Sequence, residues 1–259
     1  MLKEPITILT PTYNRKKFLP LMICNVEEFE EYDKSLINWL ILDSYSTKGE
    51  EAEPLLNPSQ LKELQKRLHP IKVEYHYLKK AMTIGEKRNW LSKNAKTKYL
   101  INMDSDDVYV PEYLHYSVNL LKKHKRECCG SPQMIFMYPK DEYKTTFISC
   151  PALRQIHEAT MCYTKKHFKR MGGYQTHGFG EGAKMIDGCK EDIFVCSQVA
   201  SCMLCICHDD NSVNKDKWND DKKRIIIDMK IPKHMKIIQE IFNTKYRPIQ
   251  SVNKESLPQ

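Results

Sequence analysis

The chain of 259 residues carries 41 lysine and arginine residues against 33 aspartate and glutamate residues, a formal net charge of +8 at neutral pH. Apolar residues make up 41% and aromatic residues 10% of the sequence, which is enough for a packed core and excludes a disordered chain. No apolar run approaches the ~20 residues that a membrane-spanning helix needs, so we expect no transmembrane segment.

Predicted strands and helices alternate through the first half of the chain. Short apolar runs predict four buried strands, at residues 6–9, 39–42, 71–77 and 99–103. Apolar residues at helical spacing predict four helices, at residues 19–29, 61–68, 85–94 and 111–121. This alternation indicates an α/β fold whose mostly parallel sheet is covered by helices on both faces. Such sheets bind ligands beyond the carboxyl ends of their strands.

The second half of the chain is less regular. Apolar runs predict strands at residues 133–138, 147–150, 160–163 and 203–206. Between the last two we expect a glycine-rich loop at 172–188 and a helix from about Glu191 to Ala200. From Asp209 the composition becomes charged, and a helix containing Met235, Ile238 and Phe242 follows. We interpret residues 209–259 as an appendage on one domain, because ~50 residues form a marginal core alone.

An acidic cluster follows the predicted strand at 99–103. Asp104, Asp106 and Asp107 place three carboxylates within four positions, a costly arrangement of like charges unless a cation offsets them. Mg²⁺ and Mn²⁺ suit such oxygen ligands and can bridge to the phosphates of a substrate. The simpler alternative is a solvated acidic turn before the helix that begins at Pro111.

Polar residues also follow two other predicted strands. Asp43 could accept hydrogen bonds from a nucleoside base or ribose, although a turn-forming aspartate is the simpler interpretation. The segment Pro11–Arg15 supplies a hydroxyl group, an aromatic ring and a guanidinium group, or forms an ordinary turn.

Six short segments, in this order, resemble the motifs of family 2 glycosyltransferases with the GT-A fold. They are Pro11–Arg15, Leu42–Thr47, Gly85–Asn89, the DxD region Asp104–Pro111, Gly172–Tyr174 and Glu191–Asp192. The chain departs from the family pattern at Asp43-Ser44, where the family often has two adjacent acids. One of the two carboxylates expected near the nucleoside is therefore absent.

The resemblance implies a GT-A fold, with a Rossmann-like, mostly parallel mixed sheet flanked by helices. Residues 1–208 would form the glycosyltransferase domain, with a nucleotide-sugar-binding half at 1–110 and an acceptor-binding half at 111–208. Residues 209–259 would form a charged loop and a helical extension.

The activity implied by the resemblance is metal-dependent, inverting transfer of a sugar from a nucleoside diphosphate sugar, preferably a UDP-sugar, to a hydroxyl group. Asp192 is the candidate base that accepts the hydroxyl proton, with Glu191 as the fallback. Asp104 and Asp106 would hold Mn²⁺ or Mg²⁺, and His208 resembles the late histidine that completes the metal site in GT-A enzymes. The donor would contact the strand ends, through Pro11, Thr12, Tyr13, Arg15, Asp43, Arg88, Asp104, Ser105 and Asp106.

Simpler interpretations of these residues remain open. His208 could be structural, Glu191 and Asp192 could form an acidic first turn of a helix, and Arg15 and Arg88 could be surface cations instead of phosphate ligands.

Two other functions compete with transfer. A sugar-phosphate nucleotidyltransferase would need a glycine-rich basic loop near the first strand, and residues 11–17 contain no glycine. A degenerate GT-A-like domain that binds a glycan or a nucleotide without turnover would not need Asp104, Asp106 and Asp192 together.

Partners and location follow from composition. The positive charge is not gathered into one block, so we expect a nucleotide sugar and a glycan or other hydroxyl acceptor, and no nucleic acid. The N-terminus lacks the long apolar region of a secretory signal. We therefore expect a cytoplasmic protein with reduced cysteines. Peripheral contact with a membrane and pairing with a second copy through the C-terminal helix are open alternatives.

Overall fold

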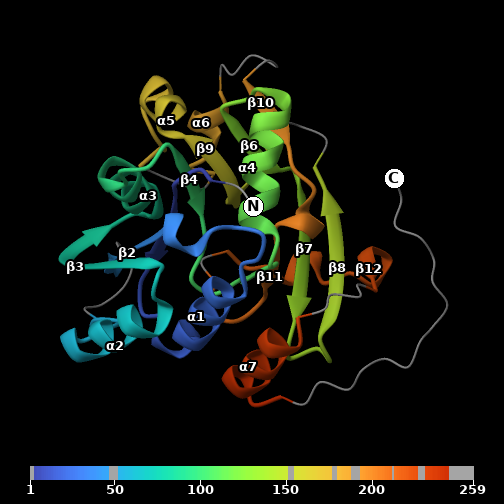
Figure 1. Ribbon diagram of the computed structural model, residues 1–259. Helices are drawn as coiled ribbons and strands as arrows, with labels where there is room; N and C mark the ends of the chain where they lie inside the picture. The colour runs from blue at the N-terminus through green and yellow to red at the C-terminus, as the bar shows by residue number, and fades with distance from the viewer. Residues whose placement is uncertain are drawn as a thin grey trace.

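A seven-stranded sheet forms the centre of the computed structural model, which describes residues 3–46, 52–150, 155–176, 180–187, 193–211, 213–226 and 231–244. In spatial order the strands are β10 (Phe194–Cys196), β6 (Cys128–Ser131), β9 (His157–Thr164), β4 (Tyr99–Asn102), β1 (Ile6–Thr12), β2 (Ile37–Ser46) and β3 (Lys72–Met82) (Figure 1). β1 pairs in parallel with both β2 and β4, and β2 pairs in parallel with β3. β9 is antiparallel to β4 and β6. The mostly parallel mixed sheet predicted from the sequence is therefore confirmed.

The central strands are buried on both faces, which explains their continuous apolar runs. Ile8 and Ile41 belong to one core cluster, whereas their neighbours Leu9 and Leu42 belong to the other. This assignment follows the alternation of side chains along a strand.

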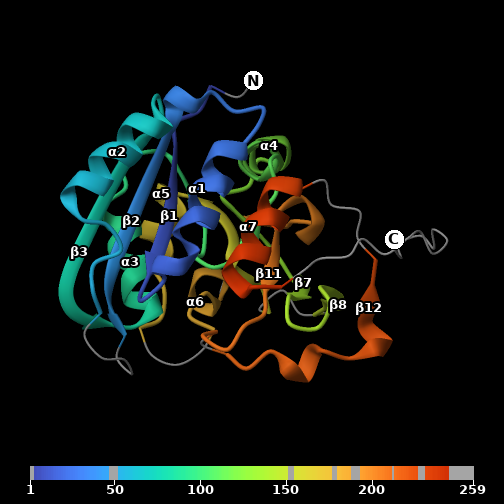
Figure 2. The same ribbon diagram turned by 90° about the horizontal axis from the view of Figure 1, so that it is seen from below.

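Seven α-helices lie in the described residues, and they divide between these two clusters. α1 (Leu19–Glu28), α2 (Pro58–Leu68), α4 (Tyr113–His124) and α7 (Pro232–Phe242) contribute to the first cluster. α3 (Ile84–Asn94), α5 (Lys165–Met171) and α6 (Ala183–Ile186) contribute to the second. Figure 2 shows the helices on both sides of the sheet.

α3 begins with a reciprocal cap that fixes its first turn. The Thr83 hydroxyl accepts a hydrogen bond from the Glu86 amide at 3.1 Å, and the Glu86 carboxylate accepts one from the Thr83 amide at 2.7 Å. These contacts satisfy two amide groups that a helix N-terminus otherwise leaves without partners. The cap positions the turn of α3 that carries Lys87 and Arg88.

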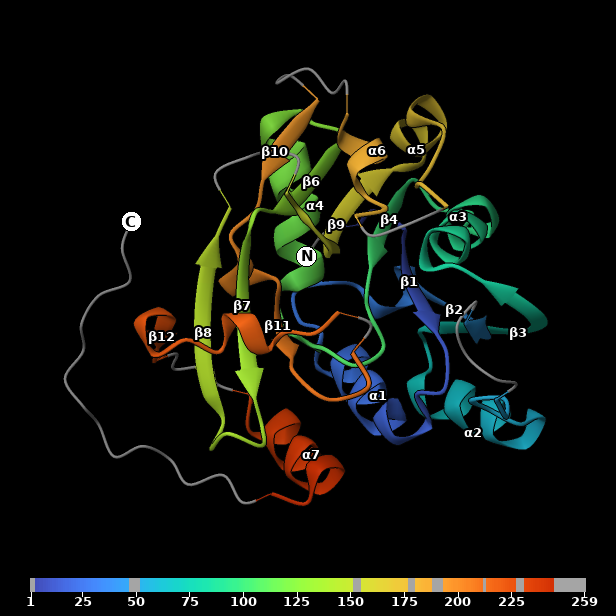
Figure 3. The same cartoon turned by 180° about the vertical axis from the view of Figure 1, so that it is seen from behind.

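A smaller, five-stranded sheet lies beside the central one, as Figure 3 shows from behind. Its spatial order is β12 (Arg224–Ile225), β8 (Lys144–Ser149), β7 (Gln133–Tyr138), β11 (Met203–Ile206) and β5 (Val108–Tyr109). β5 directly follows the acidic cluster and pairs with β11. This pairing brings residues after β11 next to the cluster.

The C-terminal helix packs inward. Ile238 of α7 is fully buried, Phe242 packs against the same core, and Lys233 forms an ion pair of 2.6 Å with Glu28 of α1. Figures 1 and 3 show α7 beside α1. The apolar stripe predicted on this helix therefore contributes to the main core.

The helix predicted from Glu191 to Ala200 is wrong over the residues that the structure describes. Phe194–Cys196 is strand β10, paired in parallel with β6, and Val199–Ser201 is a short 3-10 helix. Phenylalanine, valine and cysteine suit a half-buried strand, and a free edge of the central sheet decides the outcome here. Glu191 and Asp192 themselves lie outside the described residues.

Two further observations bear on the predictions. None of the helices in the described part of the chain has both the length and the apolar character needed to cross a bilayer. The nine cysteines in that part are free thiols.

Candidate functional site

The ends of β1, β2 and β4 bring three of the predicted segments to one edge of the central sheet. Thr12 pairs with Asp43 across β1 and β2, and Leu9 pairs with Asn102 across β1 and β4. The Met103 amide donates to the Leu9 carbonyl at 3.0 Å, so the acidic cluster begins beside β1. Parallel pairing thus gathers residues from three distant segments, as the sequence analysis predicts.

The three carboxylates of the acidic cluster have different surroundings. Asp104 accepts hydrogen bonds from Nη2 of Arg88 at 2.9 and 3.2 Å. Asp106 accepts one from Nε of Arg15 at 2.9 Å. Asp107 is 3% exposed and accepts from the Ile206 amide at 2.9 Å. Asp107 thus joins the cluster to β11, and burial raises the pKa of its carboxyl group to about 7.

His208 lies against the acidic cluster although 102 residues separate it from Asp106. Its Nε2 atom is 3.2 Å from a carboxylate oxygen of Asp106 and 2.9 Å from the Asn211 side chain. Phe18 and Phe242 both pack against the ring, with centroid distances of 4.7 and 5.9 Å. The structure therefore brings Asp106 and His208 together, as the metal-site hypothesis requires.

Asp106 and Asp104 respond differently to burial. Burial raises the pKa of Asp106, but the hydrogen bond from His208 and the charge of Arg15 outweigh that effect and hold the pKa below its usual range. Burial also raises the pKa of Asp104, and the opposing charge of Arg88 does not fully compensate. Asp106 is thus the more strongly stabilised anion of the two.

The chemistry of the proposed metal ligands Asp104, Asp106 and His208 suits a divalent cation. A carboxylate and an imidazole in contact, with a second carboxylate two residues away, are ligands that Mn²⁺ accepts. Asp104, however, is paired with Arg88. In the described ranges no three His, Cys, Asp or Glu side chains already converge on one point. Of the proposed metal ligands, Asp106 and His208 are therefore the two that already lie in contact.

Lys87 is a site residue that the sequence analysis missed. Its buried ammonium group donates to the carbonyl oxygens of Thr12 at 2.8 Å and Ser44 at 2.7 Å, and so ties the ends of β1 and β2 together. Burial lowers the pKa of Lys87 to about 8, against the charge of Asp43. The position of Lys87 directly before Arg88, in the Gly85–Asn89 segment, is the signal that could have identified it.

The other predicted donor residues lie at the same edge. Oδ2 of buried Asp43 accepts from the Leu55 amide at 2.8 Å and from the Tyr75 hydroxyl at 2.9 Å, and burial raises its pKa. The Lys87 ammonium lies 5.5 Å from the centre of the Tyr13 ring. Pro11, at the end of β1, and Ser105, within the acidic cluster, are both buried.

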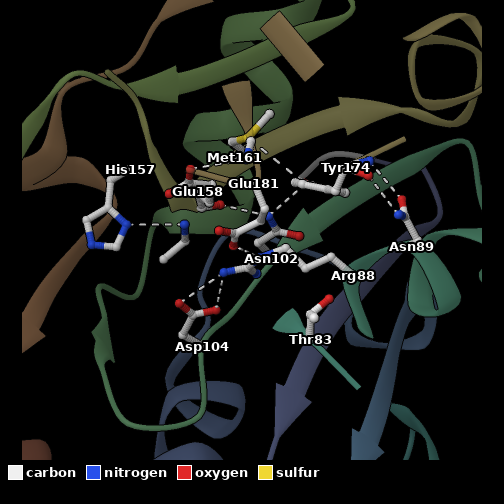
Figure 4. A network of polar contacts seen from close by, with 12 residues as sticks. Thr83, Arg88, Asn89, Asn102, Asp104, His157, Glu158, Met161, Tyr174 and Glu181 are labelled. Carbon is white, nitrogen blue, oxygen red and sulfur yellow. Dashed lines mark hydrogen bonds and ion pairs between the residues drawn. The ribbon is translucent and has the colours of Figure 1, made fainter. Parts of the chain in front are cut away.

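Arg88 links the acidic cluster to Glu181, in the half of the chain predicted to bind the acceptor (Figure 4). Its side chain is 3% exposed, and its Nε atom donates to Glu181 at 3.0 Å while Nη2 donates to Asp104. The next residue, Asn89, donates to the Tyr174 carbonyl at 2.9 Å and accepts from the Tyr174 amide at 2.8 Å. Arg88 is therefore not the surface cation considered as the alternative.

The bridging position of Arg88 leads to a stability prediction. Arg88→Met is expected to lower the free energy of unfolding by about 3–5 kcal/mol, because removing one partner of a buried ion pair leaves charge uncompensated. Urea denaturation measures the effect. Arg67→Met is the matched control: Arg67 pairs with Glu27 at 2.6 Å, but the two side chains are 58% and 33% exposed. The control is expected to lose less than about 1 kcal/mol, and equal losses would contradict the prediction.

Most of the chain matches the model of one known protein family. The model of the family described as Glycosyl transferase family 2 matches residues 7–185, from β1 to α6. No curated protein sequence matches the chain.

Solved structures share the fold. A mannosyltransferase, PcManGT from Pyrobaculum calidifontis, in complex with GDP-Man and Mn²⁺, is similar with a TM-score of 0.57 and 15% identity, over 84% of this chain and 59% of its own. TarS 1–349 from S. aureus, in complex with UDP-GlcNAc, has a TM-score of 0.58 and 13% identity over 92% of this chain and 72% of its own. The same protein in complex with UDP has a TM-score of 0.59. The chain thus spans 59% of the mannosyltransferase, and the expected GT-A type of fold is confirmed.

Proposed function

The chain belongs to glycosyl transferase family 2, and from this membership we propose that it transfers a sugar from a nucleoside diphosphate sugar to an acceptor hydroxyl group. The observation that carries the proposal is the cluster of three cations, Arg15, Lys87 and Arg88, at the carboxyl ends of β1, β2 and β4. Arg15 and Arg88 contact acids of the acidic cluster there, and Lys87 binds the Thr12 carbonyl. Cations at this edge suit a diphosphate, and guanidinium groups match phosphate geometry.

Two orphan polar atoms in the same region support a bound donor. Nη1 of Arg88 and the hydroxyl oxygen of Thr12 are buried, and neither has a hydrogen-bond partner within the described part of the chain. Buried polar groups in a folded protein are usually paired. Phosphate or sugar oxygens of the donor would satisfy both atoms.

Asp104, Asp106 and His208 would hold Mn²⁺ or Mg²⁺. A divalent ion supplies Lewis-acid stabilisation of the negative charge on the departing diphosphate. The surrounding residues favour this role: Arg15 and His208 keep Asp106 ionised, and Phe18 and Phe242 pack against the His208 ring.

The transfer would be a single displacement with inversion. The acceptor oxygen bonds to the anomeric carbon as the bond to the diphosphate oxygen breaks, and the hydroxyl proton passes to a carboxylate base. Asp192 is the candidate base, with Glu191 as the fallback. UDP is the preferred nucleotide, and the similar structures hold UDP, UDP-GlcNAc and GDP-Man.

A screen of UDP-, GDP- and dTDP-sugars with Mn²⁺ tests the function. Release of free nucleotide, accelerated by a glycan or other hydroxyl acceptor, is the expected result. Tight binding by calorimetry without release for any pair would favour a binding domain. Release of pyrophosphate from a nucleoside triphosphate and a sugar phosphate would favour a nucleotidyltransferase.

A further inference from the structure

The segment Gly180–Asp187 contacts both α3 and β9, and Figure 4 shows its residue Glu181 between Arg88 and Glu158. From α3, Arg88 donates to the Glu181 carboxylate at 3.0 Å. From β9, the Glu158 carboxyl oxygen Oε1 accepts a hydrogen bond from the Gly182 amide at 3.1 Å. The Gln175 amide donates to the Glu181 carbonyl at 3.0 Å. The segment is thus attached at adjacent residues to two different elements.

The fit on both sides is close enough to require glycine. A β-carbon on Gly182 would lie 2.4 Å from Cγ of Glu158, and one on Gly85 of α3 would lie 1.7 Å from the Gln175 carbonyl oxygen. A larger residue at Gly182 would displace the Glu158 side chain, and one at Gly85 would require a shift of the Gln175 backbone. The Glu158 side chain therefore packs directly on the backbone of the segment.

The charges around Glu158 do not balance. Glu181 is buried and Glu158 is half-buried, and Arg88 is the cation whose charge acts on both of them. Arg88 already pairs with Glu181 and with Asp104. On the same strand as Glu158, burial lowers the pKa of His157 to about 3, so its ring is neutral and accepts from the Ala159 amide. Three carboxyl groups thus share one guanidinium group.

A proton on Glu158 resolves this imbalance. Burial first, and the charge of Glu181 second, raise the pKa of Glu158 to about 7 from its ordinary value of 4.5. A neutral carboxyl group still accepts from Gly182 and no longer repels Glu181. Above pH 7 the deprotonated group would push the segment away.

We propose that Glu158 is a positioning residue for glycosyl transfer: by accepting the Gly182 amide, its carboxyl group holds the segment Gly180–Asp187 against Arg88. The contact of Glu158 with the segment does not depend on the proposed function, but its effect on sugar transfer does. Such an effect is expected because the segment precedes the candidate base Asp192 by a few residues. Its contact with Arg88 joins the acceptor side of the site to Asp104 of the acidic cluster.

Hydrogen–deuterium exchange of the Gly180–Asp187 peptide tests the positioning role without any substrate. The pKa of Glu158 is about 7 while the segment contacts it and would return to its ordinary value of 4.5 when the segment detaches. This difference predicts that wild-type protection factors fall about tenfold from pH 6 to pH 8. Glu158→Gln keeps an acceptor for Gly182 and carries no charge, so its protection is expected to stay constant. Glu158→Ala is expected to lose protection at both pH values. The control Glu63→Gln, at an exposed position of α2, is expected to follow the wild type.

A constant wild-type protection factor, or an equal fall in Glu158→Gln, would overturn the proposal. An activity measurement then tests whether this position affects transfer. In the wild type kcat/KM is expected to fall between pH 6 and pH 8, so the ratio of the pH 8 value to the pH 6 value is expected to be up to about tenfold higher in Glu158→Gln. If no nucleotide sugar is turned over, the proposed function fails, while the exchange result still decides the role of Glu158. If turnover occurs and the two ratios are equal, the positioning role in transfer is refuted.

Discussion

Removal of divalent metal with EDTA is expected to lower the rate of sugar transfer about a thousandfold, a barrier increase of about 4 kcal/mol. The structure supplies the reason. Arg15 is paired with Asp106 and Arg88 with Asp104, so these guanidinium groups are already partly neutralised by the acidic cluster. A nucleoside diphosphate leaving group would meet two carboxylates and too little free positive charge. Initial rates in metal-free buffer, with Mn²⁺ or Mg²⁺ then added back, measure the effect.

Variants separate the metal ligands from their neighbours. Asp106→Asn and His208→Ala are each expected to raise the Mn²⁺ concentration for half-maximal rate at least about tenfold. Asp209→Asn is the control, because Asp209 directly follows His208 but is 81% exposed and pairs with Lys140. Full turnover in EDTA would refute the metal role, and an unchanged Mn²⁺ requirement in His208→Ala would make that residue structural.

Replacement of Asp192 by asparagine is expected to reduce transfer between about 10² and 10⁴-fold, the usual contribution of a general base. Asparagine has nearly the same shape but cannot accept the hydroxyl proton at neutral pH. The affinity for the nucleotide, measured by calorimetry, is expected to change little, because the donor-side residues lie on other segments.

Glu191→Gln is the matched control for this experiment. Adjacent side chains in either a helix or a strand point in different directions, so only one of the two acids can face the acceptor. A large loss in Glu191→Gln with an active Asp192→Asn would assign the base to Glu191. Unimpaired transfer in both variants would place the base on another segment.

The predicted elements show how far local patterns reach. The strand at 133–138 and the helices near 19–29 and 61–68 agree closely with β7, α1 and α2, because long apolar patterns with one period specify one type of element. Residues 194–196 fit a helical pattern equally well, and only their pairing with β6 makes them a strand. The short strands β5 and β12 depend on their partners in the same way.

Some features of the candidate site could likewise be predicted from the sequence, and others depend on the tertiary structure. The residue types and their order in the chain were sufficient to predict the α/β fold and the family resemblance, and to place Asp43 and the acidic cluster at one edge of the sheet, because parallel strands deliver their ends to one edge. The resemblance also pointed to His208, which the antiparallel pairing of β11 with β5 brings to Asp106. The chain alone did not indicate that Lys87 ties two strands together, that Arg88 bridges Asp104 and Glu181, or that Glu158 faces Glu181. These features depend on burial and on contacts between segments up to 93 residues apart. Both the desolvation that shifts a pKa and the partner that offsets it arise only when the chain is packed.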